Sequence, residues 1–364
     1  MILLVGQGLA GSLLADALLR RGRTVRVVAD ARPTSSGAAA GLFNPVTGRK
    51  PQLTWLADAL FPFLHRFYPD LEARLGARFF HPMPLYRPFG SPEERAFGLA
   101  LAEQPGLRAF LQPAPDDAAY ADAVRNELGG LRTAGAGWVD VPALLAAFRR
   151  EFQARGIFLE KTFSHASLNI APWGVEWEGQ RYATVVFCEG VYGAENPFFD
   201  WLPFNPVKGE SLTLRLDGPV PPGIVNRGVW LIPNGAARTA RVGATYVWKS
   251  SGGAPPDRAP LTWEPTPDGR DFLLQKLDVW LKTPYAVAGQ VAGIRPAVQG
   301  RRPLLGLHPE FPQLGIFNGL GSKGVSLAPF FAQQFAEFLV DGKELPEAVN
   351  INRFFSLYSG RKRV

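Results

Sequence analysis

The amino-acid sequence predicts an α/β fold with two interleaved parts, one built on a parallel sheet and a second, of α+β type, built on an antiparallel sheet. The first observation is the strand–turn–helix–strand pattern of residues 2–29. The second is the strict alternation of apolar and polar side chains over residues 211–216, which is typical of an antiparallel strand. The third is length, because 364 residues exceed what one small core needs and favour two domains.

The turn after the first strand carries glycines with the spacing G-x-G-x-x-G. They are Gly6, Gly8 and Gly11, and Leu9 and Ala10 between them open a helical stretch. In this context Gly6 permits a tight turn, Gly8 lets phosphate groups approach, and Gly11 lets the helix pack closely on the strand. The pattern therefore predicts a Rossmann-like unit that binds the pyrophosphate of a dinucleotide at a helix N-terminus.

The second strand, over residues 24–29, ends at Asp30, followed by Ala31 and Arg32. An acidic residue at this place is expected to bind the ribose hydroxyls. An arginine nearby can accommodate a ribose 2′-phosphate. With Asp30 present, however, Arg32 is interpreted as solvated or as a neighbour of the phosphates.

Small residues dominate the segment 35–42 that follows the second strand. Ser35 or Ser36 is expected to N-cap a helix there. Because bulky side chains are lacking, the backbone of this segment can approach a flat ring system and its phosphates. Cofactor contacts are therefore expected at Ser35, Ser36, Ala40, Gly41 and Leu42.

Later segments return to the first sheet. An amphipathic helix over 141–155 precedes a strand over 157–160, an apolar strand ends at Cys188, and a strand over 314–317 leads through a glycine loop into a helix over 324–339. A further helix is expected over about 53–67.

Strands over 229–233 and 241–248 flank an Asn234–Gly235 turn, which predicts an antiparallel hairpin. Together with the preceding alternation, the hairpin marks a second architecture. The nucleotide-binding domain is therefore expected to comprise residues 1–78, 138–205 and 290–364, and the antiparallel-sheet domain residues 79–137 and 206–289.

Composition argues against several classes of protein. Cys188 is the single cysteine, so no intramolecular disulfide can form, and the four histidines lack the spacing of a metal site. No apolar run reaches the roughly 20 residues of a membrane-spanning helix. The N-terminal apolar run is read as a strand rather than a signal peptide, which favours a cytoplasmic protein. A net charge of +7 attracts anions weakly, and a nucleic-acid partner is not expected.

Two late motifs are more specific than the first glycine motif. One is Gly293-Ile294-Arg295-Pro296 with Arg302-Pro303-Leu304-Leu305-Gly306, and the other is Gly319-Leu320-Gly321-Ser322-Lys323-Gly324. Together with segments 5–30 and 35–42, they make the chain resemble the FAD-dependent oxidoreductases of the D-amino-acid oxidase, glycine oxidase and sarcosine oxidase superfamily. The resemblance implies FAD as cofactor, with further contacts at Phe163, Cys188 and Gly190 and along the whole 319–324 loop.

The resemblance also implies an activity. The C–N bond of an amino acid or related small amine is expected to be oxidised by hydride transfer to flavin N5, giving an imine that hydrolyses. Arg295 is the candidate for the substrate carboxylate, because a guanidinium can clamp a carboxylate with two parallel hydrogen bonds. The alternative for Arg295 is a structural salt bridge.

Two more residues are assigned on the same basis. Tyr246 is expected to border the substrate, with cross-strand packing as the alternative. Lys323, at the start of the last long helix, is expected to stabilise the reduced flavin, with a solvent-facing loop lysine as the alternative. Relatives with covalent flavin carry a cysteine in the loop that here contains Ser322, so FAD is expected to be bound non-covalently.

Two other functions stay open at this stage. One is a flavin oxidase module that acts on an aminomethyl-modified tRNA base, and the other is a non-catalytic flavoprotein subunit. The sequence does not choose the amine, the electron acceptor or the oligomeric state, a homo-oligomer included.

Overall fold

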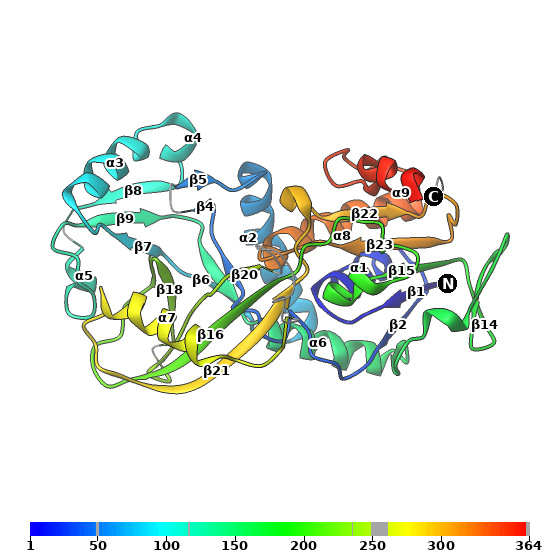
Figure 1. The fold of residues 1–364 in the computed structure, drawn as a ribbon, viewed down its shortest axis with the longest axis horizontal. Helices are drawn as coiled ribbons and strands as arrows, with labels where there is room; N and C mark the ends of the chain where they lie inside the picture. The colour runs from blue at the N-terminus through cyan, green and yellow to red at the C-terminus, as the bar shows by residue number, and fades with distance from the viewer. Residues whose placement is uncertain (49–50, 116, 235, 249–260, 362–364) are drawn as a thin grey trace.

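The computed structural model describes residues 1–48, 51–115, 117–234, 236–248 and 261–361. Two sheets lie next to each other along the longest axis of the molecule, each with its own helices (Figure 1). The predicted fold class, α/β with an antiparallel second sheet, is confirmed.

The first sheet has six strands, in the order β11-β2-β1-β15-β23-β22. All its neighbouring pairs are parallel except β22 with β23. In chain order the strands are β1 (Ile2–Val5), β2 (Val25–Ala29), β11 (Phe158–Glu160), β15 (Thr184–Phe187), β22 (Leu304–Leu307) and β23 (Leu314–Asn318). Each residue of β1 is apolar and buried, as expected where both faces of a parallel sheet are covered.

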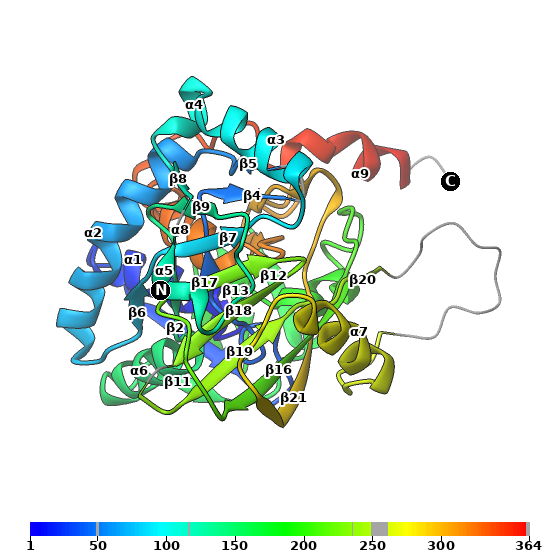
Figure 2. The ribbon, with the colours of Figure 1, turned by 90° about the vertical axis from the view of Figure 1, so that its left-hand side faces the viewer.

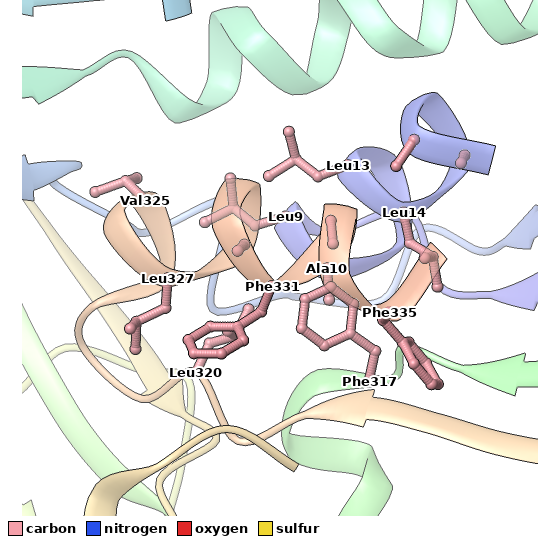
Figure 3. Close-up of a cluster of buried hydrophobic side chains, with 14 of the residues drawn as sticks. Leu9, Ala10, Leu13, Leu14, Phe317, Leu320, Val325, Leu327, Phe331 and Phe335 are labelled. Atoms are coloured by element: carbon pink, nitrogen blue, oxygen red, sulfur yellow. The ribbon is translucent and has the colours of Figure 1, made fainter. Parts of the chain in front are cut away.

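Helices from opposite ends of the chain meet on this sheet. Helix α1 (Leu9–Leu19) follows β1, and α8 (Gly324–Asp341) follows β23. Leu13 and Leu14 of α1 belong to the same buried cluster as Phe331 and Phe335 of α8 (Figure 3). Because β1 and β23 run parallel on either side of β15, both helices begin at the same edge of the sheet.

The second sheet has nine strands in the order β20-β16-β19-β18-β17-β7-β9-β8, with β21 also paired to β16. Its strands are β7 (Leu85–Pro88), β8 (Leu111–Ala114), β9 (Gly130–Thr133), β16 (Val207–Leu216), β17 (Ile224–Arg227), β18 (Val229–Asn234), β19 (Thr239–Gly243), β20 (Val247–Trp248) and β21 (Tyr285–Arg295). Every pair except β17 with β7 is antiparallel. Helix α7 (Pro267–Asp278) lies beside β16 (Figure 2) and also contacts β18.

The remaining elements connect or cover the two sheets. The other helices are α2 (Ala57–Leu75), α3 (Pro92–Ala102), α4 (Pro105–Arg108), α5 (Ala118–Ala121), α6 (Val141–Ala154), α9 (Phe355–Arg361) and the 3-10 turns η1 (His165–Ser167), η2 (Gly190–Glu195), η3 (Gln299–Arg301) and η4 (Ile351–Phe354). Small sheets are formed by β3 (Leu42–Phe43), β10 (Gly137–Val139) and β6 (Phe80–Pro82), by β12 (Leu168–Ala171), β13 (Gly174–Trp177) and β14 (Gln180–Tyr182), and by β4 (Val46–Thr47) and β5 (Gln52–Leu53).

The structure confirms most predicted elements and corrects some of them. The predicted hairpin is formed by β18 and β19, although Gly235 lies outside the described residues. Its second strand, expected over 241–248, ends at Gly243, and Val247–Trp248 form the separate strand β20, which pairs with β16. The helix expected over 53–67 begins later, at Ala57, because Leu53 pairs with Val46 in a small sheet, and it continues to Leu75.

A further correction concerns Ser35 and Ser36, which do not cap a helix. Residues 35–38 form a turn in which Gly37 N donates to Thr34 Oγ1, 3.1 Å away. Both serine hydroxyls instead bind other segments. The division into the domain ranges given above stays a prediction, and β21 runs across its boundary at residue 290.

The glycines of the first turn are required by close backbone contacts. A Cβ added to Gly11 would lie 1.9 Å from Gly6 O, and one added to Gly6, where φ is 109°, would lie 2.4 Å from Cys188 O. Neither neighbour can move without shifting a buried strand. These contacts hold α1 against β1 and β15.

Gly11→Ala is therefore expected to lower the free energy of unfolding by about 1–3 kcal/mol, as overpacking of a close-packed interior does. Gly106→Ala is the matched control, because Gly106 is an exposed residue of a short helix and an added Cβ meets no atom within 4 Å. Denaturant unfolding of both variants without added cofactor measures the difference. Equal stability of the two variants would contradict the packing argument.

Candidate functional site

The site lies where α1 and α8 begin. An added Cβ on Gly324, the first residue of α8, would lie 2.9 Å from Leu9 Cδ1, and Leu9 is the first residue of α1. Neither helix has a side-chain cap at its N-terminus. Two helix ends without a capping side chain at the N-cap position thus lie together, and their first-turn N–H groups and dipoles favour an anion.

The segment 35–42 is bound to both parts of the molecule. Leu9 N donates to Ser36 Oγ at 3.3 Å, and the Ser35 hydroxyl donates to Ile294 O in β21. Gly41 has a φ of 72°, and a Cβ there would lie 1.8 Å from Val139 O, so this close approach requires glycine. The segment thus joins the glycine turn to the strand that carries Arg295.

Asp30 and Arg32 bind each other at the end of β2. Arg32 Nε lies 2.8 Å from Asp30 Oδ2, and the Arg32 guanidinium stacks on the Tyr192 ring, 4.4 Å from its centroid. The Arg32 side chain is 48% exposed, so it is partly solvated, and its place next to the phosphates stays a prediction. Although burial raises the pKa of Asp30, the bonds from Arg32 and Thr162 outweigh it and hold that pKa below its usual value. The carboxylate is charged and can accept ribose hydroxyls.

The other predicted contacts on this side differ in what they offer. Phe163 packs between Trp177 and Phe187 in the core, so its backbone alone is available to a cofactor. Cys188 is buried, and burial raises the pKa of its thiol, so the thiol is neutral. Gly190 has a φ of 58° with no atom within 4 Å of an added Cβ, and its carbonyl accepts a hydrogen bond from the side-chain amide of Asn318.

The face of the antiparallel sheet that meets segment 35–42 is built from small residues and arginine. Directly paired residues share a face, which places Arg295, Gly293 and Gly209 together. A Cβ on Gly209 would lie 2.0 Å from Arg295 Nη2, and one on Gly293 would lie 2.8 Å from Ala38 Cβ. The absence of side chains at Gly209 and Gly293 lets the guanidinium lie across the strand and lets segment 35–42 approach.

Arg295 is held without an acidic partner. Its Nη1 donates to Lys208 O at 3.4 Å and to Thr245 O at 3.3 Å. No carboxylate among the described residues forms an ion pair with it, so the alternative of a structural salt bridge finds no support there. Burial lowers the pKa of the guanidinium, and Tyr246 offsets only part of this effect. An arginine nevertheless stays charged at neutral pH. A charged guanidinium with donors to spare is suited to a carboxylate ligand.

Tyr246 lies beside this guanidinium. The Arg295 Cζ is 4.3 Å from the centre of the Tyr246 ring, which is a cation–π contact. The Tyr246 side chain is 56% exposed, so it is not a packing aromatic of the sheet core. The structure thus brings Arg295 and Tyr246 together, as their assignment requires.

Lys323 lies at the N-terminus of α8, in the 319–324 loop. Gly321 N donates to Pro296 O at 3.3 Å, which fixes this loop next to the residue that follows Arg295. Leu320 is buried, whereas Ser322 is exposed. The pKa of Lys323 is lowered by burial first and then by Arg302 and Arg301. Lys323 is therefore partly buried near two arginines, and its role toward the flavin stays a prediction.

Sequence reasoning missed the contacts of two arginines in this region. Arg302 lies over the Trp55 ring at 4.2 Å, and Arg241 donates to Ala38 O and Ala39 O at 3.4 and 3.1 Å. Arg241 could have been noticed as an inward-facing charge in the alternating strand of the predicted hairpin. Arg302 stood inside a quoted motif, but the stack on Trp55 joins segments almost 250 positions apart and left no signal in the sequence.

These residues fit a flavin dinucleotide. The glycine turn and segment 35–42 form a cradle that side chains would fill, two uncapped helix ends suit phosphate oxygens, and Asp30 offers a ribose acceptor. Gly6, Gly8, Asp30 and Ser36 would hold the nucleotide half, and the 319–324 loop with Lys323 would hold the ring half. In the part of the chain that the structure describes, no group of three or more His, Cys, Asp or Glu residues could bind a metal ion. No helix there is both long and apolar enough to cross a membrane.

Comparisons with known proteins agree with this geometry. The chain is similar to the solved structure of iminodiacetate oxidase from Chelativorans sp. BNC1, at 20% identity and a TM-score of 0.74 over 97% of this chain and 98% of that one. It is similar to glycine oxidase from Geobacillus kaustophilus, at 21% identity and a TM-score of 0.73 over 97% of each chain. It is also similar to L-amino acid deaminase from Proteus vulgaris, at 15% identity and a TM-score of 0.75 over 98% of this chain and 96% of that one. At these identities the solved structures establish the fold. The family model described as FAD dependent oxidoreductase matches residues 1–338, so the protein belongs to the FAD-dependent oxidoreductases, enzymes whose cofactor is FAD.

Proposed function

We propose that this enzyme oxidises the C–N bond of an amino acid, or of a related amine that carries a carboxylate. The observation that supports this most strongly is the Arg295 guanidinium, which is held by two carbonyl oxygens and has no ion pair among the described residues. A substrate carboxylate would satisfy the remaining donors. Similarity to enzymes named for amino acids and iminodiacetate agrees with this substrate class.

The chain contributes binding, orientation and electrostatics. FAD, when bound, supplies the acceptor for the hydride that leaves the carbon next to the nitrogen. Arg295 would fix the carboxylate, and Tyr246 would border the substrate. Because Arg295, Lys323 and Arg302 are cations, they lower the pKa of a substrate ammonium and favour the neutral amine, from which hydride transfer is easier. The imine product then hydrolyses in water.

Removal of the Arg295 guanidinium tests the substrate assignment. In Arg295→Ala we expect the rate at which carboxylate-bearing amines bleach the flavin anaerobically to fall by about 10- to 150-fold. A loss of this size corresponds to one lost hydrogen bond between charged groups. The panel pairs each amino acid with the amine that lacks its carboxylate. Arg215→Ala, which changes an exposed arginine at the other end of β16, is the control and should behave as wild type. An equal loss for both members of each pair would overturn the assignment, and retained flavin absorbance shows that the variant is folded.

We further propose that Lys323 and the N-terminus of α8 stabilise the negative charge that the flavin gains on reduction. In Lys323→Met the two-electron reduction potential of the bound flavin is expected to fall by about 20–60 mV, at about 30 mV for each 1.4 kcal/mol. Lys343→Met, which changes an exposed lysine, should leave the potential unchanged. A potential unaffected by Lys323→Met would assign Lys323 to the loop surface.

FAD is expected to be bound without a covalent link. Ser322 occupies the loop position at which a cysteine would be needed, and the single cysteine, Cys188, is buried with a neutral thiol. Acid precipitation should therefore release all yellow colour into the supernatant. Colour that stays in the washed pellet would show a covalent bond and contradict this expectation.

A further inference from the structure

A buried ion pair lies behind the residues of the site. Lys208 and Glu210 of β16 are 5% and 2% exposed, and Lys208 Nζ lies 3.3 Å from Glu210 Oε1. Successive residues of a strand point to opposite faces. Gly209 between them meets the Arg295 guanidinium, so the two charged side chains lie on the other face of the sheet, toward α7.

The Glu210 carboxylate accepts from donors on every side. Its Oε2 is 2.8 Å from Thr266 N and 2.7 Å from Gln290 Nε2, and its Oε1 is 2.8 Å from the Thr266 hydroxyl. A Cβ on Gly269 would lie 2.7 Å from the Glu210 Cδ, so the first turn of α7 rests directly on this carboxylate. Burial raises the pKa of Glu210, but these bonds and Lys208 outweigh it, and the pKa lies below its usual value.

The main chain of the same two residues holds the site. Arg295 Nη1 donates to Lys208 O and to Thr245 O. Thr245 is in turn fixed by Glu210, because Glu210 N donates to Thr245 Oγ1 at 2.9 Å and Thr245 N donates to Glu210 O at 3.2 Å. Both acceptors of the guanidinium are therefore set by residues 208 and 210.

Gln290 connects the carboxylate to the strand of Arg295. The pairing of β16 with β21 shifts register between Thr213 and Leu214, next to the Gln290 pair with Leu212. A shift of this kind disrupts the ladder of hydrogen bonds locally. Gln290 lies between the register shift and Arg295 along β21, so the Glu210–Gln290 hydrogen bond holds the part of the strand that carries Arg295.

We infer that the Lys208–Glu210 pair positions Arg295 for the substrate carboxylate, as a positioning device on the face of the sheet opposite the site. Glu210 is its centre, because its carboxylate binds β21, the start of α7 and Lys208, while its main chain binds Thr245. Lys208 also donates to Glu264 O and so ties the segment before α7 to the same point. This inference rests on the proposed role of Arg295.

The test uses the FAD-loaded Glu210→Gln variant. Glutamine is nearly isosteric with glutamate. The four groups around the carboxylate, Thr266 N, the Thr266 hydroxyl, Gln290 Nε2 and Lys208 Nζ, all donate to it, so the amide nitrogen of the glutamine must face at least one donor. We expect the concentration of carboxylate-bearing amine that half-saturates anaerobic flavin reduction to rise about 10-fold, while the limiting reduction rate changes less than 3-fold. Asp117→Asn is the matched control, because it removes a buried carboxylate of the same sheet region whose partner is Arg132.

A double-mutant comparison separates positioning from general destabilisation. In an Arg295→Lys background, Glu210→Gln should add less than a 2-fold change, because its effect acts through the guanidinium. A further 10-fold loss there, or an equal loss in Asp117→Asn, would overturn the inference.

Crystal structures of the FAD-loaded wild type and Glu210→Gln provide a readout that needs no substrate. The Arg295 guanidinium should leave Lys208 O and Thr245 O in the variant. If it keeps both bonds, the inference is wrong even when no amine bleaches the flavin, whereas a moved guanidinium with no bleaching would overturn the proposed function alone.

Discussion

The contact between the first turns of α1 and α8 is the constraint on which the rest of the structure depends. The two helices come from opposite ends of the chain, and a Cβ added to Gly324 would lie 2.9 Å from Leu9 Cδ1. Their contact requires β1, β15 and β23 to be adjacent and parallel, which in turn puts both helix N-termini at one edge of the sheet. The two positive ends thereby lie close together, and we propose that one receives the phosphates of FAD and the other the reduced ring.

The antiparallel sheet meets that edge through small residues. Gly209 and Gly293 let segment 35–42 approach, and the Ser35 hydroxyl and the Arg241 guanidinium bind the two parts together. Arg295 thus lies on a face that is closed by the nucleotide-binding part, although it comes from the other sheet. The site exists only where the two architectures touch.

Local patterns predicted the parts of this structure that depend on short stretches of sequence. The glycine turn, the strand that ends at Asp30 and the 319–324 loop could all be predicted, because each is formed by residues that are neighbours in the sequence. The turn and the loop also need glycine at positions with positive φ. Ser35 and Ser36 were misread as helix caps, because their hydroxyls bind Leu9 and Ile294, partners remote in sequence. The Glu210 network had no signal for the same reason, since Thr266 and Gln290 lie 56 and 80 positions away.

The charge balance explains why such a network is needed. Arg295, Lys323 and Arg302 are partly buried cations, and burial lowers the pKa of each, so the folded chain holds them at a cost that an anionic ligand would offset. A guanidinium without a fixed carboxylate partner must be held by neutral carbonyl oxygens, which bind it more weakly than an acid would. The position of those carbonyls then decides where the guanidinium lies. A buried acid on the opposite face can fix the carbonyls without neutralising the guanidinium, and this leaves the charge of Arg295 available to the substrate.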